Sequence, residues 1–333
     1  MKTTLIKDIL GLPAEGQTVE LSGWVRTKRE SKNILFLAVN DGSCMASIQL
    51  TFDRALPGGG ETEESLTGVL TGAAVRARGR LVPSPAQGQA VEVALQGIDV
   101  LGEAPQDYPL QKKNHSLEFL REVAHLRART NTFGAVARVR SQMAFGIHSF
   151  FQSQGFQYFS APIITASDCE GAGEMFQVTT LDLEKIRGKA DYGADFFGKR
   201  AFLTVSGQLA GETYATALSR IYTFGPTFRA ENSNTTRHIA EFWMIEPEMA
   251  FYDLEDNSGL AESLIKYLLN WALEKCGDDM KFFDERIKPG NMETLSRVAA
   301  SGFERVTYTD AVKELEKHSG VFEFKPFWGC DLQ

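Results

Sequence analysis

The sequence predicts an α+β protein of more than one domain, in which a small N-terminal β-barrel precedes a larger domain of helices and strands. Residues 18–100 contain five short segments in which apolar and polar residues alternate, as they do in half-buried strands. From Asn131 to Gln154 apolar residues instead recur at helical spacing, and Gly155 follows as a C-terminal cap. The length of 333 residues is sufficient for two or three domains.

The barrel is predicted from its strands and from the turns between them. Gly42 and the Pro- and Gly-rich stretches 57–60 and 83–88 mark the turns, and Glu63–Leu70 is compatible with a single helix. The five strands are Val19–Val25, Ile34–Val39, Ala46–Phe52, Ala73–Leu81 and Val91–Leu95. This content suits a closed barrel of the oligonucleotide-binding type, with a β-sandwich fragment as the alternative.

The larger region is predicted from further apolar segments. Its strands are Tyr158–Ile164, Ala201–Val205, Ile221–Phe228 and Ala240–Phe251, and its helices after Gly155 are Gln208–Ser219 and Leu260–Lys275. Between the two regions, residues 103–130 begin with two prolines and continue as a basic segment. We expect this segment to be a hinge.

Composition excludes several classes of protein. With 43% apolar and 23% charged residues the chain is that of an ordinary globular protein. It has no run of about 18 to 20 apolar residues and no signal peptide at Met1–Glu15, so we expect a cytoplasmic protein without a membrane partner. The four cysteines lack a CxxC pair, which predicts reduced thiols.

Net charge is −8, which argues against a protein that coats nucleic acid. Local charge matters more than the total, because phosphate attraction is screened within about 10 Å. A basic stripe lies in the barrel region at Arg26, Lys28, Arg29 and Lys32. The barrel therefore retains the capacity to contact a polyanion.

A polar constellation lies around the loop Asn232–Arg237 in the larger region. The segment Phe228-Arg229-Ala230-Glu231 precedes this loop and His238-Ile239-Ala240-Glu241-Phe242 follows it. Two strands joined there would surround one concavity, in which Arg binds a phosphate, Glu accepts from an amino group and Phe stacks on a base. A solvated hairpin with an Arg229–Glu231 ion pair is the alternative. Neither a GxxxxGK[ST] nor a GxGxxG phosphate loop is present.

This constellation resembles motif 2 of the class II aminoacyl-tRNA synthetases. Gly155-Phe156-x-x-Phe159-x-x-Pro162-Ile163-Ile164 resembles their motif 1, whose proline lies at the dimer interface. Gly23-Trp24-Val25-Arg26, followed by Phe36 and Gln49, resembles the anticodon-binding barrel of the aspartate, asparagine and lysine subgroup. The resemblance implies an OB-fold anticodon-binding domain at 1–102, the hinge at 103–130, a class II antiparallel-sheet catalytic domain at 131–333, and a homodimer.

Within that subgroup the chain resembles the bacterial asparaginyl-tRNA synthetases. Ser206 and Gln208 match the Ser-x-Gln-Leu segment of the substrate site, but Gly211 stands where aspartate enzymes have a lysine that faces the substrate carboxylate. Glu246, where those enzymes have Asp, would accept from a neutral amide. In the lid-like segment 166–176, Glu170 would contact the substrate ammonium group. An aspartyl-tRNA synthetase is the alternative.

The resemblance also implies the reaction and its residues. The asparagine α-carboxylate would attack the α-phosphorus of ATP, and the adenylate would then acylate tRNA(Asn). Arg229 and Glu231 are the predicted catalytic residues. The predicted ATP-binding residues are Arg229, Glu231, Arg237, His238 and Phe242. The predicted anticodon-binding residues are Arg26 and Arg29 for phosphates, Phe36 for stacking and Gln49 for a base edge. Phe36 as part of the barrel core is the alternative.

The chain departs from the family in one respect. Motif 3, a glycine-rich segment with a second ATP-binding arginine, is absent, and the family's acidic Mg²⁺ ligands belong to the same missing part. The chain stops at Trp328–Gln333, where relatives continue. These features predict a truncated synthetase with ATP and Mg²⁺ as cofactors, no metal ligand within residues 1–333, and no measurable activation by this chain alone. A non-catalytic tRNA-binding fragment is the remaining alternative.

Overall fold

The computed structural model describes residues 4–55, 59–86, 88–169, 171, 174–232 and 238–332. They divide into two compact units, residues 1–142 with 275–289 and residues 143–274 with 290–333. The division crosses helix α4 (Asn131–Ser153). This division differs from the predicted domain boundaries after residues 102 and 130. Those boundaries stay a prediction.

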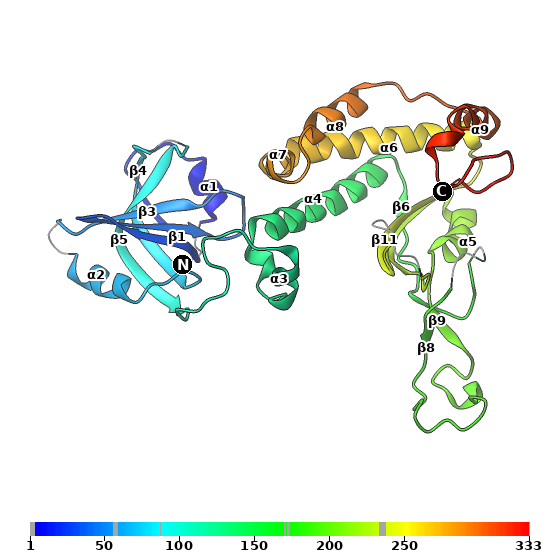
Figure 1. Ribbon diagram of the computed structural model, residues 1–333, viewed down its shortest axis with the longest axis horizontal. Helices are drawn as coiled ribbons and strands as arrows, with labels where there is room; N and C mark the ends of the chain where they lie inside the picture. The colour runs from blue at the N-terminus through cyan, green and yellow to red at the C-terminus, as the bar shows by residue number, and fades with distance from the viewer. Residues whose placement is uncertain are drawn as a thin grey trace. The chain divides into compact units, whose positions relative to one another are not determined.

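The first unit contains the closed five-stranded barrel that the sequence predicts (Figure 1). Its strands are β1 (Thr18–Glu30), β2 (Ile34–Asn40), β3 (Ile48–Asp53), β4 (Ala74–Pro83) and β5 (Val91–Gly102), joined in the order β1-β2-β3-β5-β4. The predicted helix is α2 (Gly60–Thr67). The structure adds a helix that the sequence pattern did not predict, α1 (Ile6–Leu10), whose Ile6 and Ile9 are fully buried in the barrel core.

The period of two residues in the sequence fixes which side chains enter this core. On β2, Leu35, Leu37 and Val39 are buried, whereas Phe36 between them is only partly buried and is not part of the core cluster. Side chains on a strand point alternately to its two faces, so Phe36 lies on the outer face of the barrel. The alternative that placed Phe36 in the core is wrong.

The basic segment after the barrel forms α3 (Leu117–Glu122) and a short 3-10 helix, η1 (Arg127–Arg129). The guanidinium of Arg129 lies 5.3 Å from the centre of the Trp24 ring, and its Nη1 donates to Tyr108 Oη at 3.1 Å. The contact with Trp24 attaches the segment to β1, whereas the hydrogen bond to Tyr108 lies within the segment. Helix α7 (Gly277–Arg286) completes this unit.

The second unit contains two small sheets. In the first, the central strand β10 (Arg220–Phe228) pairs antiparallel with β11 (Glu241–Met249) and parallel with β6 (Gln157–Tyr158). In the second, β9 (Ala201–Leu203) lies between β7 (Ile164–Thr165) and β8 (Gln177–Val178).

One predicted strand is wrong in extent. Tyr158–Ile164 is not a single strand, because its ends form β6 and β7 in different sheets. Pro162 lies between them and lacks the N–H that a continuous ladder requires. The chain therefore leaves one sheet before the proline and enters the other after it.

The second unit also contains several helices. They are α5 (Gln208–Leu218), α6 (Leu254–Lys275), α8 (Asn291–Ala300) and α9 (Tyr308–Lys317), with the 3-10 helices η2 (Tyr192–Ala194) and η3 (Ser319–Val321). The predicted helix at 260–275 begins six residues earlier, and α7, α8 and α9 had not been predicted. The predicted helix α4 ends as expected, since Gly155 adopts the left-handed conformation, with φ of 78°.

The core of the second unit is aromatic. Side chains of α4, β10 and α6 meet there, and Phe151 stacks on Tyr222 with ring centres 4.5 Å apart. His148 Nδ1 lies 2.7 Å from Tyr222 Oη. Burial raises the pKa of this tyrosine above its ordinary value. This core supports β10 from the side of α4 and so fixes the strand that carries the site.

Candidate functional site

Glu246 on β11 is the centre of a polar cluster. Its Oε1 accepts from the Ser206 hydroxyl, and its Oε2 accepts from the backbone N–H of Gly207 at 3.0 Å and from Thr223 Oγ1 at 2.7 Å. Gly207 is the N-cap of α5, and the N-terminus of a helix favours a negative charge. The predicted pair Ser206 and Glu246 is therefore in direct contact.

This carboxylate lines a cavity of about 240 Å³. The cavity is bordered by residues of the β6–β7 connection, by the middle of β10 and by Trp243 of β11. Gly207 forms part of the wall, where an added Cβ would lie 2.9 Å from Thr223 Oγ1 and 3.1 Å from Glu246 Oε2. Only glycine permits this approach of the α5 N-terminus to the carboxylate.

Gly211 is buried one turn further along α5. A Cβ at this position would lie 3.3 Å from Ile221 Cδ1, so α5 packs against β10 through this glycine. A lysine at this position would require this contact to open by a few tenths of an ångström. Gly211 thus has a packing role and does not itself line the cavity, whose described lining residues include no Lys or Arg.

Gln208 and Glu170 are the two other predicted substrate residues, and only Gln208 lies among the described residues. The side chain of Gln208 donates to Glu212 Oε1 at 2.9 Å, whereas its backbone N–H donates to Ser206 Oγ at 3.0 Å. Gln208 therefore contacts the cluster through its backbone. Glu170 lies outside the described residues, and its role stays a prediction.

The predicted nucleotide residues lie at the ends of β10 and β11. The Arg229 guanidinium lies 5.5 Å from the centre of the Phe242 ring, and its Nε is buried with no hydrogen-bond partner in the described chain. A buried N–H without an acceptor is costly, so this group is suited to an anionic ligand. Glu231 and His238 are exposed, and Arg237 lies outside the described residues.

The barrel brings three predicted anticodon residues together. Arg29 Nη2 donates to Gln49 Oε1 at 3.1 Å, and the same guanidinium lies 5.6 Å from the centre of the Phe36 ring. Gln49 Nε2 donates to Glu92 Oε2 at 3.2 Å. Because Arg only donates and a carboxylate only accepts, these partners fix the orientation of the Gln49 amide. One N–H and one lone pair of the amide remain available for a base edge.

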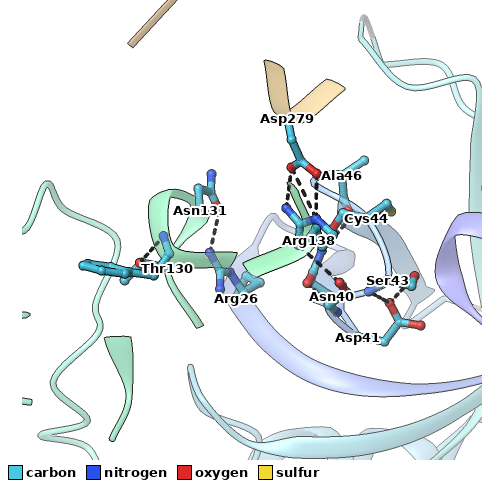
Figure 2. A network of polar contacts seen from close by, with 12 residues as sticks. Arg26, Asn40, Asp41, Ser43, Cys44, Ala46, Thr130, Asn131, Arg138 and Asp279 are labelled. Carbon is cyan, nitrogen blue, oxygen red and sulfur yellow. Dashed lines mark hydrogen bonds and ion pairs between the residues drawn. The ribbon is translucent and has the colours of Figure 1, made fainter. Parts of the chain in front are cut away.

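Arg26 lies apart from this group. Its Nη1 donates to the backbone oxygen of Arg129 and its Nη2 donates to Asn131 Oδ1 at 2.8 Å, as Figure 2 shows for the latter. Burial lowers the pKa of Arg26 below its ordinary value. The side chain is thus engaged with the segment that follows the barrel, and its phosphate contact stays a prediction.

The sequence reasoning missed Thr223 and Glu92. Thr223 is a polar residue in the apolar strand Ile221–Phe228, and Glu92 is the charged residue of Val91–Leu95, so each was visible as an exception to its pattern. Glu92 is only 8% exposed and also accepts from Ser84 Oγ at 2.9 Å. Such buried polar groups hold the groups around them in place.

Neither a metal centre nor a membrane span is found in the part of the chain that the structure describes. No group of three or more His, Cys, Asp or Glu residues there is arranged to hold a metal ion. No helix among these residues has both the length and the apolar character that crossing a bilayer requires.

The predicted interface residue Pro162 is exposed between β6 and β7.

Comparison with known proteins agrees with this geometry. Residues 116–330 match the family of class II tRNA synthetases (D, K and N), and residues 19–101 match the family of OB-fold nucleic acid binding domains. The asparaginyl-tRNA synthetase of Pyrococcus horikoshii, solved with asparaginyl-adenylate, superposes with a TM-score of 0.83 at 24% identity, over 100% of this chain and 70% of that one. The fold of both units is therefore that of this group.

Sequence relatives define the family more closely. The asparagine–tRNA ligase of Treponema denticola is 63% identical over 99% of this chain and 72% of its own length. That of Salmonella typhimurium is 54% identical over 100% of this chain and 72% of its own length. On these matches and on the residues assembled around Glu246, the chain belongs to the asparagine–tRNA ligases, a family of class II tRNA synthetases.

Proposed function

We propose that this chain provides the amino-acid site, part of the ATP site and the anticodon-binding surface of an enzyme that joins L-asparagine to tRNA(Asn). The observation that carries the proposal is the Glu246 carboxylate in the wall of the 240 Å³ cavity. Its position supports asparagine, because a carboxylate accepts from an amide N–H and repels a second carboxylate. None of the described residues that line the cavity is a Lys or Arg that would offset that repulsion.

ATP is proposed to bind next to Arg229 and Phe242. In the first step the α-carboxylate of asparagine attacks the α-phosphorus, a new O–P bond forms, and the bond to the departing pyrophosphate breaks. Arg229 would neutralise charge at the α-phosphate, which is the main help that such a step needs. Its unpaired Nε and its contact with the Phe242 ring support this role. Mg²⁺, when bound with ATP, would neutralise further phosphate charge.

Transfer is proposed to follow from the same site. The terminal 3′-hydroxyl of tRNA attacks the carbonyl carbon of the adenylate and AMP leaves. The outer face of the barrel would bind the anticodon, with Phe36 as stacking platform and Arg29 and Gln49 as polar contacts. Their mutual contacts support this assignment, since base stacking on an aromatic ring beside a cation is a common mode of RNA binding.

A homodimer is also proposed, through the region around Pro162. Apolar side chains there and on α4 are exposed: Ile163 is 41%, Ile164 44% and Phe145 61% exposed. An exposed apolar surface of this kind favours a protein interface. Sedimentation of Ile164→Glu should show a monomer where the unchanged chain forms a dimer.

A cytoplasmic location stays a prediction.

The function is tested by ligand preference. Calorimetry of the 333-residue chain with non-hydrolysable analogues of asparaginyl- and aspartyl-adenylate should give tighter binding of the asparaginyl analogue by at least about tenfold, which corresponds to ~1.4 kcal/mol. Preference for the aspartyl analogue would assign the chain to aspartate. Binding of tRNA with no affinity for either analogue would leave only the tRNA-binding role.

A further inference from the structure

Hydroxyl groups among the described residues that line the 240 Å³ cavity are bonded to backbone carbonyl oxygens. The pairs are Tyr158 with Phe224 O at 3.2 Å, Thr227 with Phe242 O at 3.2 Å, and Thr204 with Ser206 O. A carbonyl oxygen only accepts, so each of these hydroxyls must give its proton to the protein. For a ligand in the cavity they keep only lone pairs, and therefore act as acceptors.

Thr223 lines the same cavity, and the acceptor of its proton is Glu246 itself. Its Oγ1 donates to Glu246 Oε2 at 2.7 Å, across a position where the register of β10 and β11 pairs the two residues directly. A carboxylate only accepts, as a carbonyl does. The hydroxyl of Thr223 is thus turned into an acceptor by the residue to which the substrate amide is assigned.

The two branches of the Thr223 side chain have different neighbours. An added Cβ at Gly207, which lines the cavity, would lie 2.9 Å from Thr223 Oγ1. An added Cβ at Gly211, which does not line it, would lie 3.6 Å from Thr223 Cγ2. The hydroxyl is therefore on the cavity side, and the methyl group packs towards α5. Because Thr223 is β-branched and only 3% exposed, packing holds it in this orientation.

Ser160 and Trp243 complete the hydrogen-bonding side chains of the described lining. No contact within the described part of the chain uses the hydroxyl of Ser160 or the indole N–H of Trp243, so these two groups keep a proton to donate. An amide offers two N–H groups and one oxygen, whereas a carboxylate offers two oxygens that accept. A lining of several acceptors and few donors therefore matches the amide.

We propose that Thr223 is the second acceptor for the side-chain amide of asparagine, and so a specificity-determining residue of this site. Glu246 accepts one N–H of the amide and Thr223 Oγ1 accepts the other. The carboxylate of aspartate would face two acceptors with no proton to give. A site built on such hydrogen bonds rejects a ligand that leaves its buried polar groups unpaired. The inference rests on the proposed function and names a further contact of the same site.

Calorimetry of the 333-residue chain with the two non-hydrolysable adenylate analogues tests this role. Thr223→Val keeps the methyl group beside Gly211 and removes the hydroxyl. Its affinity for the asparaginyl analogue should fall about 2- to 12-fold, as expected for one neutral hydrogen bond. Its affinity for the aspartyl analogue should change by less than about twofold, because that ligand has no N–H for Thr223. The preference for asparagine should therefore narrow, and Thr223→Ser should restore it.

Thr62→Val is the matched control. Thr62 is also buried and also donates to a single oxygen, Gln96 O at 3.3 Å, but it lies in the barrel. Its replacement should alter the affinity for neither analogue. Thr223→Ser and Thr223→Ala provide a second comparison, since both lack the methyl group and they differ only in the hydroxyl. Thr223→Ala should bind the asparaginyl analogue more weakly than Thr223→Ser by the same factor, even where valine disturbs the fold.

The outcomes separate this inference from the proposed function. An equal loss of affinity for both analogues in Thr223→Val, or no loss for either, would overturn the inference and leave the proposed function standing. Equal affinities of Thr223→Ser and Thr223→Ala for the asparaginyl analogue would do the same. An unchanged chain that prefers the aspartyl analogue, or binds neither, would reject the proposed function and this inference with it.

Discussion

Replacing Glu246 by Gln tests the chemistry of the amino-acid site with the smallest change of shape. A carboxylate has about four lone-pair positions for hydrogen bonds. In the structure the Ser206 hydroxyl, the Gly207 N–H and the Thr223 hydroxyl approach these positions. About one position is left for an N–H of the substrate amide, and it belongs to a charged acceptor.

The size of the effect follows from that arrangement. In Glu246→Gln an NH₂ group replaces one oxygen, and the hydroxyls of Ser206 and Thr223 can rotate to accept from it, whereas the N–H of Gly207 cannot. The remaining oxygen therefore satisfies Gly207, and the substrate loses its charged acceptor. A hydrogen bond to a charged group contributes about 1.5–3 kcal/mol, so the affinity for asparagine should fall about 10- to 100-fold.

Calorimetry with the non-hydrolysable asparaginyl-adenylate analogue measures this loss. The aspartyl analogue should lose less affinity or gain some, because the repulsive charge is gone. Glu262→Gln is the matched control: Glu262 is partly buried, accepts from Lys266 Nζ at 2.6 Å and lies away from the cavity, so its replacement should not alter binding. Wild-type affinity of Glu246→Gln for the asparaginyl analogue would refute the role of Glu246.

Three further predictions concern other parts of the chain. Phe36→Ala should weaken anticodon stem–loop binding by ~1–3 kcal/mol and leave analogue binding unchanged, and equal affinity for the stem–loop would remove Phe36 from the RNA surface. Asp279→Ala should lower the free energy of unfolding by about 3–5 kcal/mol in urea titrations. The reason is that Arg138, which is partly buried and donates to Asp279 through Nε and Nη2 (Figure 2), would lose its carboxylate partner. A loss below ~1 kcal/mol would contradict this. The carboxylate of Asp195 accepts from Thr179 Oγ1 at 2.6 Å and from Thr180 N at 2.9 Å, and these hydrogen bonds lower its pKa to about 2. Asp195→Asn should lower the free energy of unfolding at neutral pH. The difference in unfolding free energy from the unchanged chain should shrink as pH falls from 3.8 towards about 2, because the depressed pKa stabilises the fold only while the carboxylate is ionised. A difference that does not change with pH would contradict the role of Asp195.

Much of the fold follows from local pattern in the sequence. The barrel strands and α4 were predicted because alternation and helical spacing report which face of an element is apolar, and both persist over many residues. Helix α1 was missed because five residues are too few to show a helical period. The segment 158–164 was assigned as one strand because its apolar residues are continuous, and the effect of Pro162 on pairing depends on where the neighbouring strands lie.

The candidate site shows the same division. Motif resemblance predicted Glu246 and Ser206 as neighbours and Phe36, Gln49 and Arg29 as one surface, and the structure places each set in contact. Arg26 lies in the same basic stretch of the sequence as Arg29, and nothing in that stretch indicates that its side chain bonds to Arg129 and Asn131. A side chain selects its partners among all groups within reach, and many of these are distant in the sequence.

Tertiary structure alone decided which groups surround the carboxylate of Glu246, the proposed acceptor for the substrate amide. Thr223 reaches Glu246 because the register of β10 and β11 pairs these two residues directly, and Gly207 reaches it because a missing Cβ lets α5 approach. Periodicity reports the face on which a residue lies, but it contains neither the register between strands nor the distance between a helix and a sheet. Those are set by packing over the whole unit, so the hydrogen bonds that hold Glu246 exist only once the chain has folded.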